Sequence, residues 1–425
     1  MPRYTSYPTA AEFHDGVGAE AYSDALEAVA PGTPLSVYVH IPFCSSICWY
    51  CGCNTGAASK AQRMTAYLEA LEAELALVAK RIGGRGCLRR IAFGGGSPNA
   101  LSTVEFVRLL DRMITVFAAG QPDISIEIDP RGFTPEWALV LAASNVTRVS
   151  LGVQTFAPHV QASIGRIQPL SLIENCVSAL RMRGIAAINF DLMYGLPNQS
   201  LDDLADSIEL AITLRPTRVA LFGYAHLPNM IARQRRIDGG ALPDANLRFR
   251  QSAMGFDLLV AAGYVPIGFD HFALPEDPLA SAAKSGGVRR NFQGFTEDAN
   301  DTLLGFGASS ISMLPGLLVQ NEKNIGTYRA RVNAGSLPTA RGFMPDALDI
   351  KHSHWIERLL CEGHVEIGPD SQTRQALKPF EDRGLTKWRG DTLYIEDSGR
   401  PYARCIAAIF DRFRQSDKNG ASQAV

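Results

Sequence analysis

Long apolar runs are missing from this chain of 425 residues. No stretch reaches the roughly 18 consecutive apolar residues of a membrane-spanning helix, and residues 1–16 lack the apolar centre of a signal peptide. An excess of charge of one sign is missing too, because 41 lysines and arginines stand against 43 aspartates and glutamates. The net charge of −2 gives no general attraction to nucleic acid. We therefore expect a cytoplasmic protein with neither a membrane span nor a nucleic-acid partner.

Cysteine is scarce but concentrated, since four of the eight cysteines lie within ten residues, at Cys44, Cys48, Cys51 and Cys53. The first three follow a C-x3-C-x2-C spacing, and such runs of thiolates hold iron–sulfur clusters. Three ligands for a four-iron cluster leave one iron open to a small molecule. A zinc site is an alternative, although zinc sites usually combine two paired-cysteine units or add histidines, and no second unit is present. A disulfide pair is another, although disulfide frameworks are typical of small secreted chains.

Short apolar segments alternate with segments of helical periodicity between residues 35 and 265. The predicted strands are Leu35–His40, Arg90–Phe93, Ile124–Ile128, Arg148–Val153, Ile188–Met193 and Val219–Tyr224. The predicted helices between them are Thr65–Lys80, Val104–Val116, Pro135–Ala143, Leu172–Arg183 and Leu201–Leu214. Strands that are apolar on both faces and alternate with helices indicate a parallel sheet. The sequence thus predicts the α/β class, with a closed or partial (β/α) barrel.

The pattern changes downstream of residue 335. Helices are predicted at Ala347–Leu359, Arg374–Asp382 and Pro401–Phe413, with a hairpin inside Gly384–Tyr394. They indicate a small, mostly helical, winged-helix-like C-terminal domain over 335–414. The remaining predicted parts are an N-terminal arm over 1–34, the barrel with a substrate-binding extension over 35–334, and a disordered tail over 415–425.

Polar residues and glycines gather where the predicted strands end. In α/β barrels the chemistry lies at the carboxyl ends of the strands, so these residues predict one shared site. They are His40, Gly94-Gly95-Gly96-Ser97, Glu127, Asp129, Gln154, Asp191 and Tyr224 to His226. A carboxylate inside a barrel, such as that of Glu127, needs a cation or hydrogen-bond donors to offset its desolvation.

Several of these segments resemble a known family. The C-x3-C-x2-C spacing resembles the signature of the radical S-adenosylmethionine (SAM) superfamily, in which the open iron binds SAM. A closer resemblance, to the oxygen-independent coproporphyrinogen III oxidases, rests on Pro2–Thr9, Tyr38–Cys44, Gly94–Pro98, Ser125–Pro130, Gly152–Gln154, Asp191–Pro197, Tyr224–Pro228 and Asn291–Gly294. Cys53 and the opening segment are similar to the oxidases rather than to their haem-chaperone relatives, which usually have phenylalanine in place of Cys53.

The resemblance implies an anaerobic step of haem synthesis. Two propionates of coproporphyrinogen III become vinyl groups with loss of carbon dioxide, giving protoporphyrinogen IX, while two SAM become two 5′-deoxyadenosine and two methionine. The implied cofactors are a [4Fe-4S] cluster and two molecules of SAM, and the cofactors carry the difficult chemistry while the protein orients them. The implied partners are coproporphyrinogen III and an electron donor such as flavodoxin or ferredoxin, and a monomer is expected.

The resemblance also implies residue roles. Cys44, Cys48 and Cys51 would hold the cluster. The residues implied for the first SAM are Tyr38, Tyr50, Gly95, Gly96, Ser97, Glu127 and Ile311. Those implied for the second SAM are Gln154, Arg166, Asp191 and Ala225. Arginine pairs well with carboxylates, so Arg3, Arg289 and Arg290 are candidates for the substrate propionates.

Simpler interpretations of these residues stay open. Tyr50 would serve as a hydrophobic loop anchor, the glycines as a turn, Glu127 in a salt bridge, Arg166 as a solvated charge and His40 as a core histidine. A haem chaperone and a radical-SAM methyltransferase of related fold are the alternative functions, and a zinc-binding interaction protein is more remote. Family members commonly carry a further segment before Pro2–Thr9, so we expect a shorter cover over the site here.

Overall fold

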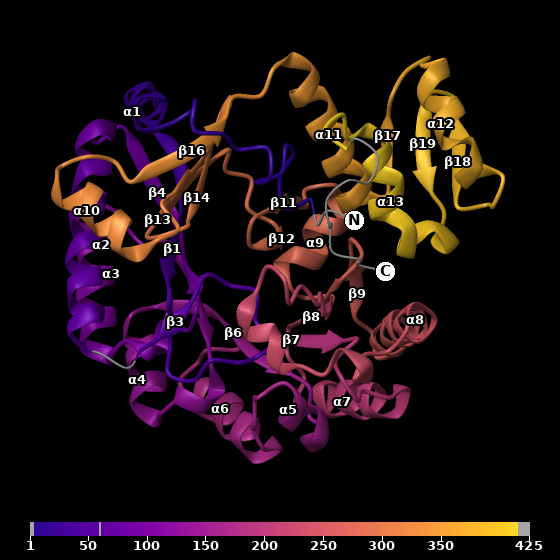
Figure 1. Cartoon of the computed structure of the whole chain (residues 1–425), viewed down its shortest axis with the longest axis horizontal. Helices are drawn as coiled ribbons and strands as arrows, with labels where there is room; N and C mark the ends of the chain where they lie inside the picture. The colour runs from indigo at the N-terminus through magenta and orange to yellow at the C-terminus, as the bar shows by residue number, and fades with distance from the viewer. Residues whose placement is uncertain (1–3, 59–60, 415–425) are drawn as a thin grey trace.

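A curved sheet of twelve strands forms the centre of the molecule, with helices around its outer face (Figure 1). The computed structural model describes residues 4–58 and 61–414. Six neighbouring strands of the sheet are parallel, and they are β1 (Thr33–Ile41), β4 (Gly86–Gly95), β5 (Asp123–Ile128), β6 (Val146–Gln154), β7 (Ala187–Tyr194) and β8 (Arg218–Gly223). Five of them contain the strand predicted from the sequence, and β8 covers the predicted Val219–Tyr224 except for Tyr224. Their apolar side chains are buried between the sheet and the surrounding helices.

Helices follow these strands along the chain. These helices are α2 (Ala61–Ile82), α3 (Thr103–Val116), α4 (Pro135–Ala143), α5 (Pro158–Ser163), α6 (Leu170–Met182), α7 (Leu201–Leu214) and α8 (Ala245–Ala261). Four of them, α3, α4, α7 and α8, begin at a residue whose side chain caps the first turn. Ser102 and Glu105 form a capping box that starts α3, and Ser200 and Asp203 form one that starts α7. Such boxes satisfy amide groups that the first helical turn leaves free.

The sheet is an open barrel. It runs in the order β16-β15-β14-β13-β1-β4-β5-β6-β7-β8-β10-β9, and within the described residues its edge strands β16 (Thr339–Phe343) and β9 (Val265–Ile267) do not pair with each other. Beyond β8, strands β10 (His271–Ala273) and β9 are antiparallel. The predicted partial barrel is therefore confirmed, and each end of its parallel core is extended by antiparallel strands.

The other antiparallel extension corrects one predicted boundary. β13 (Thr302–Phe306) pairs in parallel with β1, and β14 (Ile311–Leu314), β15 (Leu317–Asn321) and β16 follow in antiparallel order. Because β16 is hydrogen bonded to β15, residues 339–343 belong to the main sheet. The boundary predicted between residues 334 and 335 therefore lies too early in the chain.

Helices and a small sheet follow this last strand. The helices are α11 (Ala347–Glu362), α12 (Ser371–Glu381) and α13 (Ala403–Ala407), and the sheet contains β17 (His364–Glu366), β18 (Thr386–Arg389) and β19 (Thr392–Ile395). The predicted hairpin is confirmed as β18 and β19. The predicted helix Pro401–Phe413 is wrong in extent, because only a short α-helix between two 3-10 turns forms there.

The beginning of the described chain packs into this small C-terminal core. Tyr4 and Tyr7 are buried there, Tyr4 donates to Asp411 Oδ2 over 2.9 Å, and the amide of Arg412 donates to the Tyr7 hydroxyl over 3.1 Å. Helix α1 (Ala19–Glu27) instead lies against α2 and the β15–β16 edge. The predicted arm thus contacts both the barrel and the C-terminal segment. The predicted tail and Arg3 lie outside the described residues.

None of the helices in the described part of the chain has the length and hydropathy needed to cross a lipid bilayer.

Candidate active site

The predicted polar residues meet at one edge of the parallel sheet, where its strands end. Register brings them side by side, since His40 of β1 pairs with Gly94 of β4, and Gly152 of β6 pairs with Asp191 of β7. The cysteine loop leaves the end of β1 directly, through Pro42 and Phe43. The loop and the strand ends thus form one site, as the sequence predicts for the carboxyl ends of parallel strands.

Backbone hydrogen bonds fix the start of the cysteine loop. The amides of Gly96 and Ser97 donate to the carbonyls of Ile41 and Phe43, each over 2.8 Å. A Cβ atom on Gly96 would lie 2.5 Å from the Phe43 carbonyl oxygen, so this close approach requires glycine. Gly95 has a φ of +104° and packs against the His40 ring. The Gly94–Ser97 segment therefore positions the chain that carries Cys44.

The far side of the loop is held by residues that the sequence did not single out. Gln234, only 1% exposed, donates to the carbonyl oxygens of Tyr50 over 2.8 Å and Ala225 over 3.1 Å. Arg233 donates to the Thr55 hydroxyl over 2.8 Å and to its carbonyl over 2.9 Å. One short 3-10 helix (Ala232–Arg236) therefore connects the cysteine loop to the end of β8.

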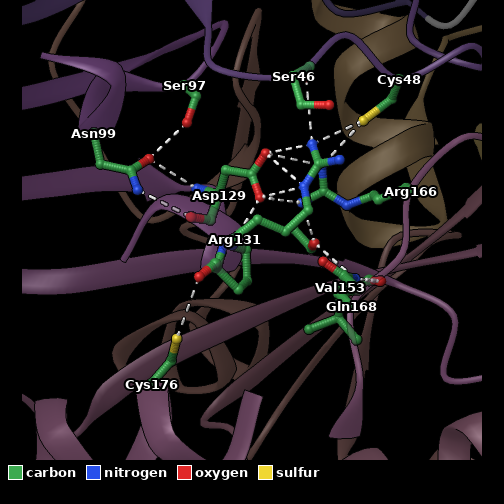
Figure 2. A network of polar contacts seen from close by, with 12 residues as sticks. Ser46, Cys48, Ser97, Asn99, Asp129, Arg131, Val153, Arg166, Gln168 and Cys176 are labelled. Atoms are coloured by element: carbon green, nitrogen blue, oxygen red, sulfur yellow. Dashed lines mark hydrogen bonds and ion pairs between the residues drawn. The ribbon is translucent and has the colours of Figure 1, made fainter. Parts of the chain in front are cut away.

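Two arginines contact Cys48, and one aspartate binds both of them from the side away from the sulfur (Figure 2). Cys48 is 6% exposed, and its sulfur accepts hydrogen bonds from Arg131 Nη2 at 3.1 Å and from Arg166 Nη1 at 3.2 Å. Asp129 lies between the two guanidinium groups, 2.6 Å from Arg131 Nη2 and 3.2 Å from Arg166 Nη2. Although burial raises the pKa of Asp129, the hydrogen bonds and charges of the two arginines outweigh it and lower that pKa. Asp129 is thus held as a carboxylate.

Glu127 faces the space inside the curve of the sheet. Solvent can reach the side chain, but protein surrounds the space that the side chain faces. Glu127 is therefore a carboxylate at an opening inside the protein. The Gly95 amide donates to Oε2 over 3.2 Å. Burial raises the pKa of Glu127 to about 7, and the nearby Asp191 carboxylate adds to the increase. A bound cation would reverse this effect, because opposite charge favours the ionised carboxylate.

Asp191 and Gln154 occupy the next two strands. Asp191 accepts hydrogen bonds from Asn189 Nδ2 at 2.9 Å and Ser150 Oγ at 3.1 Å, which lower its pKa, while burial has the larger effect and raises it. Gln154 sits at an irregularity in the β6–β7 register with a left-handed φ of +69°. Non-glycine residues rarely adopt this conformation, and such positions cluster at ligand sites.

Comparison with known proteins agrees with this geometry. Residues 38–211 match the model of the radical SAM superfamily. The oxygen-independent coproporphyrinogen III oxidase of Bradyrhizobium diazoefficiens is 41% identical over 100% of this chain and 97% of its own, and that of Pseudomonas aeruginosa is 37% identical over 98% and 94%. The structure of coproporphyrinogen III oxidase from Escherichia coli, described as a radical SAM enzyme, superposes with a TM-score of 0.91 at 34% identity, covering 97% of each chain.

The chain belongs to the oxygen-independent coproporphyrinogen III oxidase family. Membership confirms the predicted radical SAM fold, the enzyme class and the predicted cofactors, a [4Fe-4S] cluster with SAM.

The donor set of this oxidase fits the cluster. Cys44, Cys48, Cys51 and Cys53 are all free, so the disulfide alternative has no support. Similarity to the radical SAM superfamily implies a [4Fe-4S] cluster at these cysteines in place of zinc. The buried Nε of Arg166 has no hydrogen-bond partner in the described chain, which leaves a donor available beside the loop.

The other predicted site residues of the oxidase are placed as follows. Tyr38 Oη lies 3.3 Å from His40 Nδ1, and His40 Nε2 lies 3.1 Å from the Asn54 carbonyl oxygen. His40 is thus both buried and hydrogen bonded, as expected of a core histidine. Tyr50 packs against an apolar cluster that contains Tyr224. Ser97 Oγ donates to Asn99 Oδ1 over 2.6 Å.

The remaining candidates lie on the later strands and on the hairpin of β11 (Arg289–Asn291) and β12 (Gly294–Thr296). Ile311 is half-buried at the start of β14, and His226 Nδ1 lies 2.9 Å from Tyr224 Oη. Arg289, on β11 (Arg289–Asn291), is paired with Asp301 and Glu357, each at 3.2 Å, so its charge is already offset. Arg290 lies over the Phe295 ring, 4.3 Å from its centroid, and donates from Nε to the Tyr4 carbonyl.

Proposed function

We propose that this chain converts coproporphyrinogen III to protoporphyrinogen IX without oxygen. The observation that carries the proposal is the loop with three free thiols at the end of β1, which opens beside the Glu127 carboxylate within an open parallel barrel. Overall similarity to the Escherichia coli oxidase over 97% of both chains supports it.

The proposed site residues divide by ligand. Cys44, Cys48 and Cys51 would hold the cluster, which with SAM supplies a 5′-deoxyadenosyl radical when bound. Glu127 would accept the amino group of the first SAM. The pKa of this carboxyl group is raised in the protein, and a nearby cation would lower it again and so favour the carboxylate. The residues proposed for the rest of the first SAM are Tyr38, Tyr50, Gly95, Gly96, Ser97 and Ile311.

A second SAM is proposed to contact Gln154, Arg166, Asp191 and Ala225. Two hydrogen bonds already orient Asp191, and a carboxylate fixed in this way can accept hydrogen bonds from ribose hydroxyls. Arg166 would contribute its free Nε, because its other donors are engaged with Asp129, Cys48 and the Gly152 carbonyl.

The proposed reaction balances without net electron transfer. Each propionate loses a hydrogen atom from the carbon at its ring side, which converts one SAM fragment to 5′-deoxyadenosine. Loss of carbon dioxide and transfer of one electron to a one-electron acceptor then leave the vinyl group, while one electron enters for each SAM cleaved. A one-electron donor such as flavodoxin or ferredoxin would supply that electron, and we propose a monomeric, cytoplasmic enzyme.

The test is an anaerobic assay of the iron–sulfur-reconstituted protein with SAM, a reductant and coproporphyrinogen III. Protoporphyrinogen IX and 5′-deoxyadenosine are expected together, the latter only when substrate is present. Substrate-independent 5′-deoxyadenosine without the porphyrin product would reject the substrate while retaining the radical SAM core.

Cysteine variants test the ligand assignment. Replacing Cys44, Cys48 or Cys51 by alanine should abolish bound iron and sulfide, whereas Cys53→Ala should keep a full cluster. Loss of iron from Cys53→Ala would make Cys53 a ligand and contradict the assignment.

A further inference from the structure

Arg131 is placed to act on the cysteine loop and on its sulfur at once (Figure 2). Its Nη2 donates to Cys48 Sγ at 3.1 Å and lies 3.4 Å from the Ser46 carbonyl oxygen. Its Nε donates to Asp129 Oδ1 at 3.0 Å, and the Arg131 amide donates to the same oxygen at 3.1 Å. Asp129 therefore clamps the guanidinium through Nε and Nη2, and the same Nη2, 2.6 Å from Asp129 Oδ2, also reaches the loop.

The charges around the Cys48 sulfur do not cancel. Arg131 and Arg166 bring two positive charges to it, and Asp129 brings one negative charge. At the opposite end of the barrel, by contrast, Arg218 and Arg148 share Asp277, and Arg218 also pairs with Glu297. The group beside Cys48 thus keeps a net positive charge, directed at a sulfur atom.

A positive group of this kind favours a negatively charged sulfur. Ionised donors form the stronger hydrogen bonds, and hydrogen bonds to the ligand sulfurs are one of the factors that set the reduction potential of an iron–sulfur cluster. The reduced cluster carries one more negative charge than the oxidised cluster. Donors and positive charge at a ligand sulfur therefore stabilise the reduced state more.

We propose that Arg131 is a positioning residue that, held by Asp129, fixes the Ser46–Cys48 turn and makes the cluster easier to reduce. The inference rests on the proposed function only in taking Cys48 as a cluster ligand. The cluster must be reduced before SAM can be cleaved, so Arg131 would act on the first step of the reaction without contacting SAM or substrate.

The test compares Arg131→Gln with Arg108→Gln in the reconstituted full-length protein. Arg108 lies on the outer helix α3 and pairs with Glu72, and its side chain is 59% exposed, so it controls for loss of one arginine. Midpoint potentials are measured by redox titration with electron paramagnetic resonance, after iron and sulfide analysis. At a fixed potential we expect the reduced-to-oxidised ratio to fall at least tenfold in Arg131→Gln, about 59 mV for one electron, and to stay unchanged in Arg108→Gln.

Arg131→Lys keeps the charge but not the planar fork that reaches Asp129 and Cys48 together. We expect a fall of about threefold in this variant, between those of the native protein and Arg131→Gln. If Arg131→Gln binds no iron, the lysine variant decides the question by the same titration.

The outcomes separate the two proposals. An unmodified protein without iron and sulfide would reject the cluster site itself. A full cluster with the native potential in Arg131→Gln, or in Arg131→Lys where the glutamine variant binds no iron, would overturn the role of Arg131 and leave the proposed function intact. Loss of the cluster from both variants would overturn the effect on reduction and restrict Arg131 to holding the turn.

Discussion

The Glu127 carboxylate makes a sharp prediction about how SAM binding depends on pH. Burial and the Asp191 charge raise the pKa of Glu127 to about 7 in the protein without SAM. If Glu127 receives the SAM amino group, only the ionised carboxylate binds well. SAM binding should then displace a proton from Glu127, and affinity should fall as the pH drops below 7.

The size of this effect follows from the pKa. With a pKa of about 7, about nine tenths of Glu127 is ionised at pH 8 and about one tenth at pH 6. The dissociation constant for SAM should therefore rise about tenfold between pH 8 and pH 6 from this group alone. Glu127→Gln removes the ionisation while keeping size and shape, so it should bind SAM more weakly at pH 8 and lose this pH dependence.

Isothermal titration of the reconstituted protein with SAM at pH 6, 7 and 8 measures the effect. Comparison with Glu127→Gln cancels the titration of SAM itself, because both proteins bind the same ligand. Glu209→Gln, on the exposed face of α7, is the control and should follow the native profile. Parallel pH profiles for the native protein and Glu127→Gln would refute the assignment of Glu127 to the SAM cation.

Three further predictions concern stability, each measured by urea unfolding. Gly96→Ala should lower the free energy of unfolding by about 1–3 kcal/mol, because its Cβ would lie 2.5 Å from a backbone oxygen. Gly120→Ala is the control and should leave the free energy of unfolding unchanged, because nothing lies within 4 Å of its Cβ. Equal losses in the two variants would contradict the packing argument. Asp277→Ala should lower the free energy of unfolding by about 3 kcal/mol, because it removes the carboxylate shared by the buried Arg218 and the partly buried Arg148, while Arg218 keeps its pair with Glu297. Its exposed neighbour Glu276 should cost under about 1 kcal/mol when replaced by alanine. Burial raises the pKa of Glu74 to about 7, so the protonated side chain should stabilise the fold fully below about pH 4.5, and this stabilisation should be lost as the pH rises through 7. Glu74→Gln should make the free energy of unfolding less dependent on pH over this range. An unchanged pH dependence in Glu74→Gln would reject Glu74 as its source.

The parallel half of the fold was predictable because its strands are apolar on both faces. A strand such as Ile188–Met193 is recognisable in the sequence because it is apolar throughout and a helix that begins with a capping box follows it. The strands β9, β10 and β11 were missed, since each has three residues and exists only through its partner strand. The local sequence likewise gives no sign that β16 pairs with β15, and the predicted boundary between residues 334 and 335 therefore lies too early in the chain.

Site residues could be predicted where they lie at the ends of strands. They could not be predicted where only the tertiary fold brings them to the cysteine loop. Glu127 and Asp191 are marked by their positions on strands. Gln234 is separated from Tyr50 by 184 residues and lies in an arginine-rich segment typical of a solvated surface. Arg131 follows the Asp129-Pro130 pair directly, but only the fold brings its side chain to Cys48. A long-range contact of this kind has no local sequence signal.

The most direct test of the account uses coproporphyrinogen III deuterated at the ring-side carbon of its propionates. Each protoporphyrinogen IX should form together with two molecules of 5′-deoxyadenosine, each carrying one deuterium, and two molecules of carbon dioxide. Protoporphyrinogen IX formed with unlabelled 5′-deoxyadenosine would contradict hydrogen abstraction from the ring-side carbon of the propionate. Absence of protoporphyrinogen IX from a protein with a full cluster would contradict the proposed substrate.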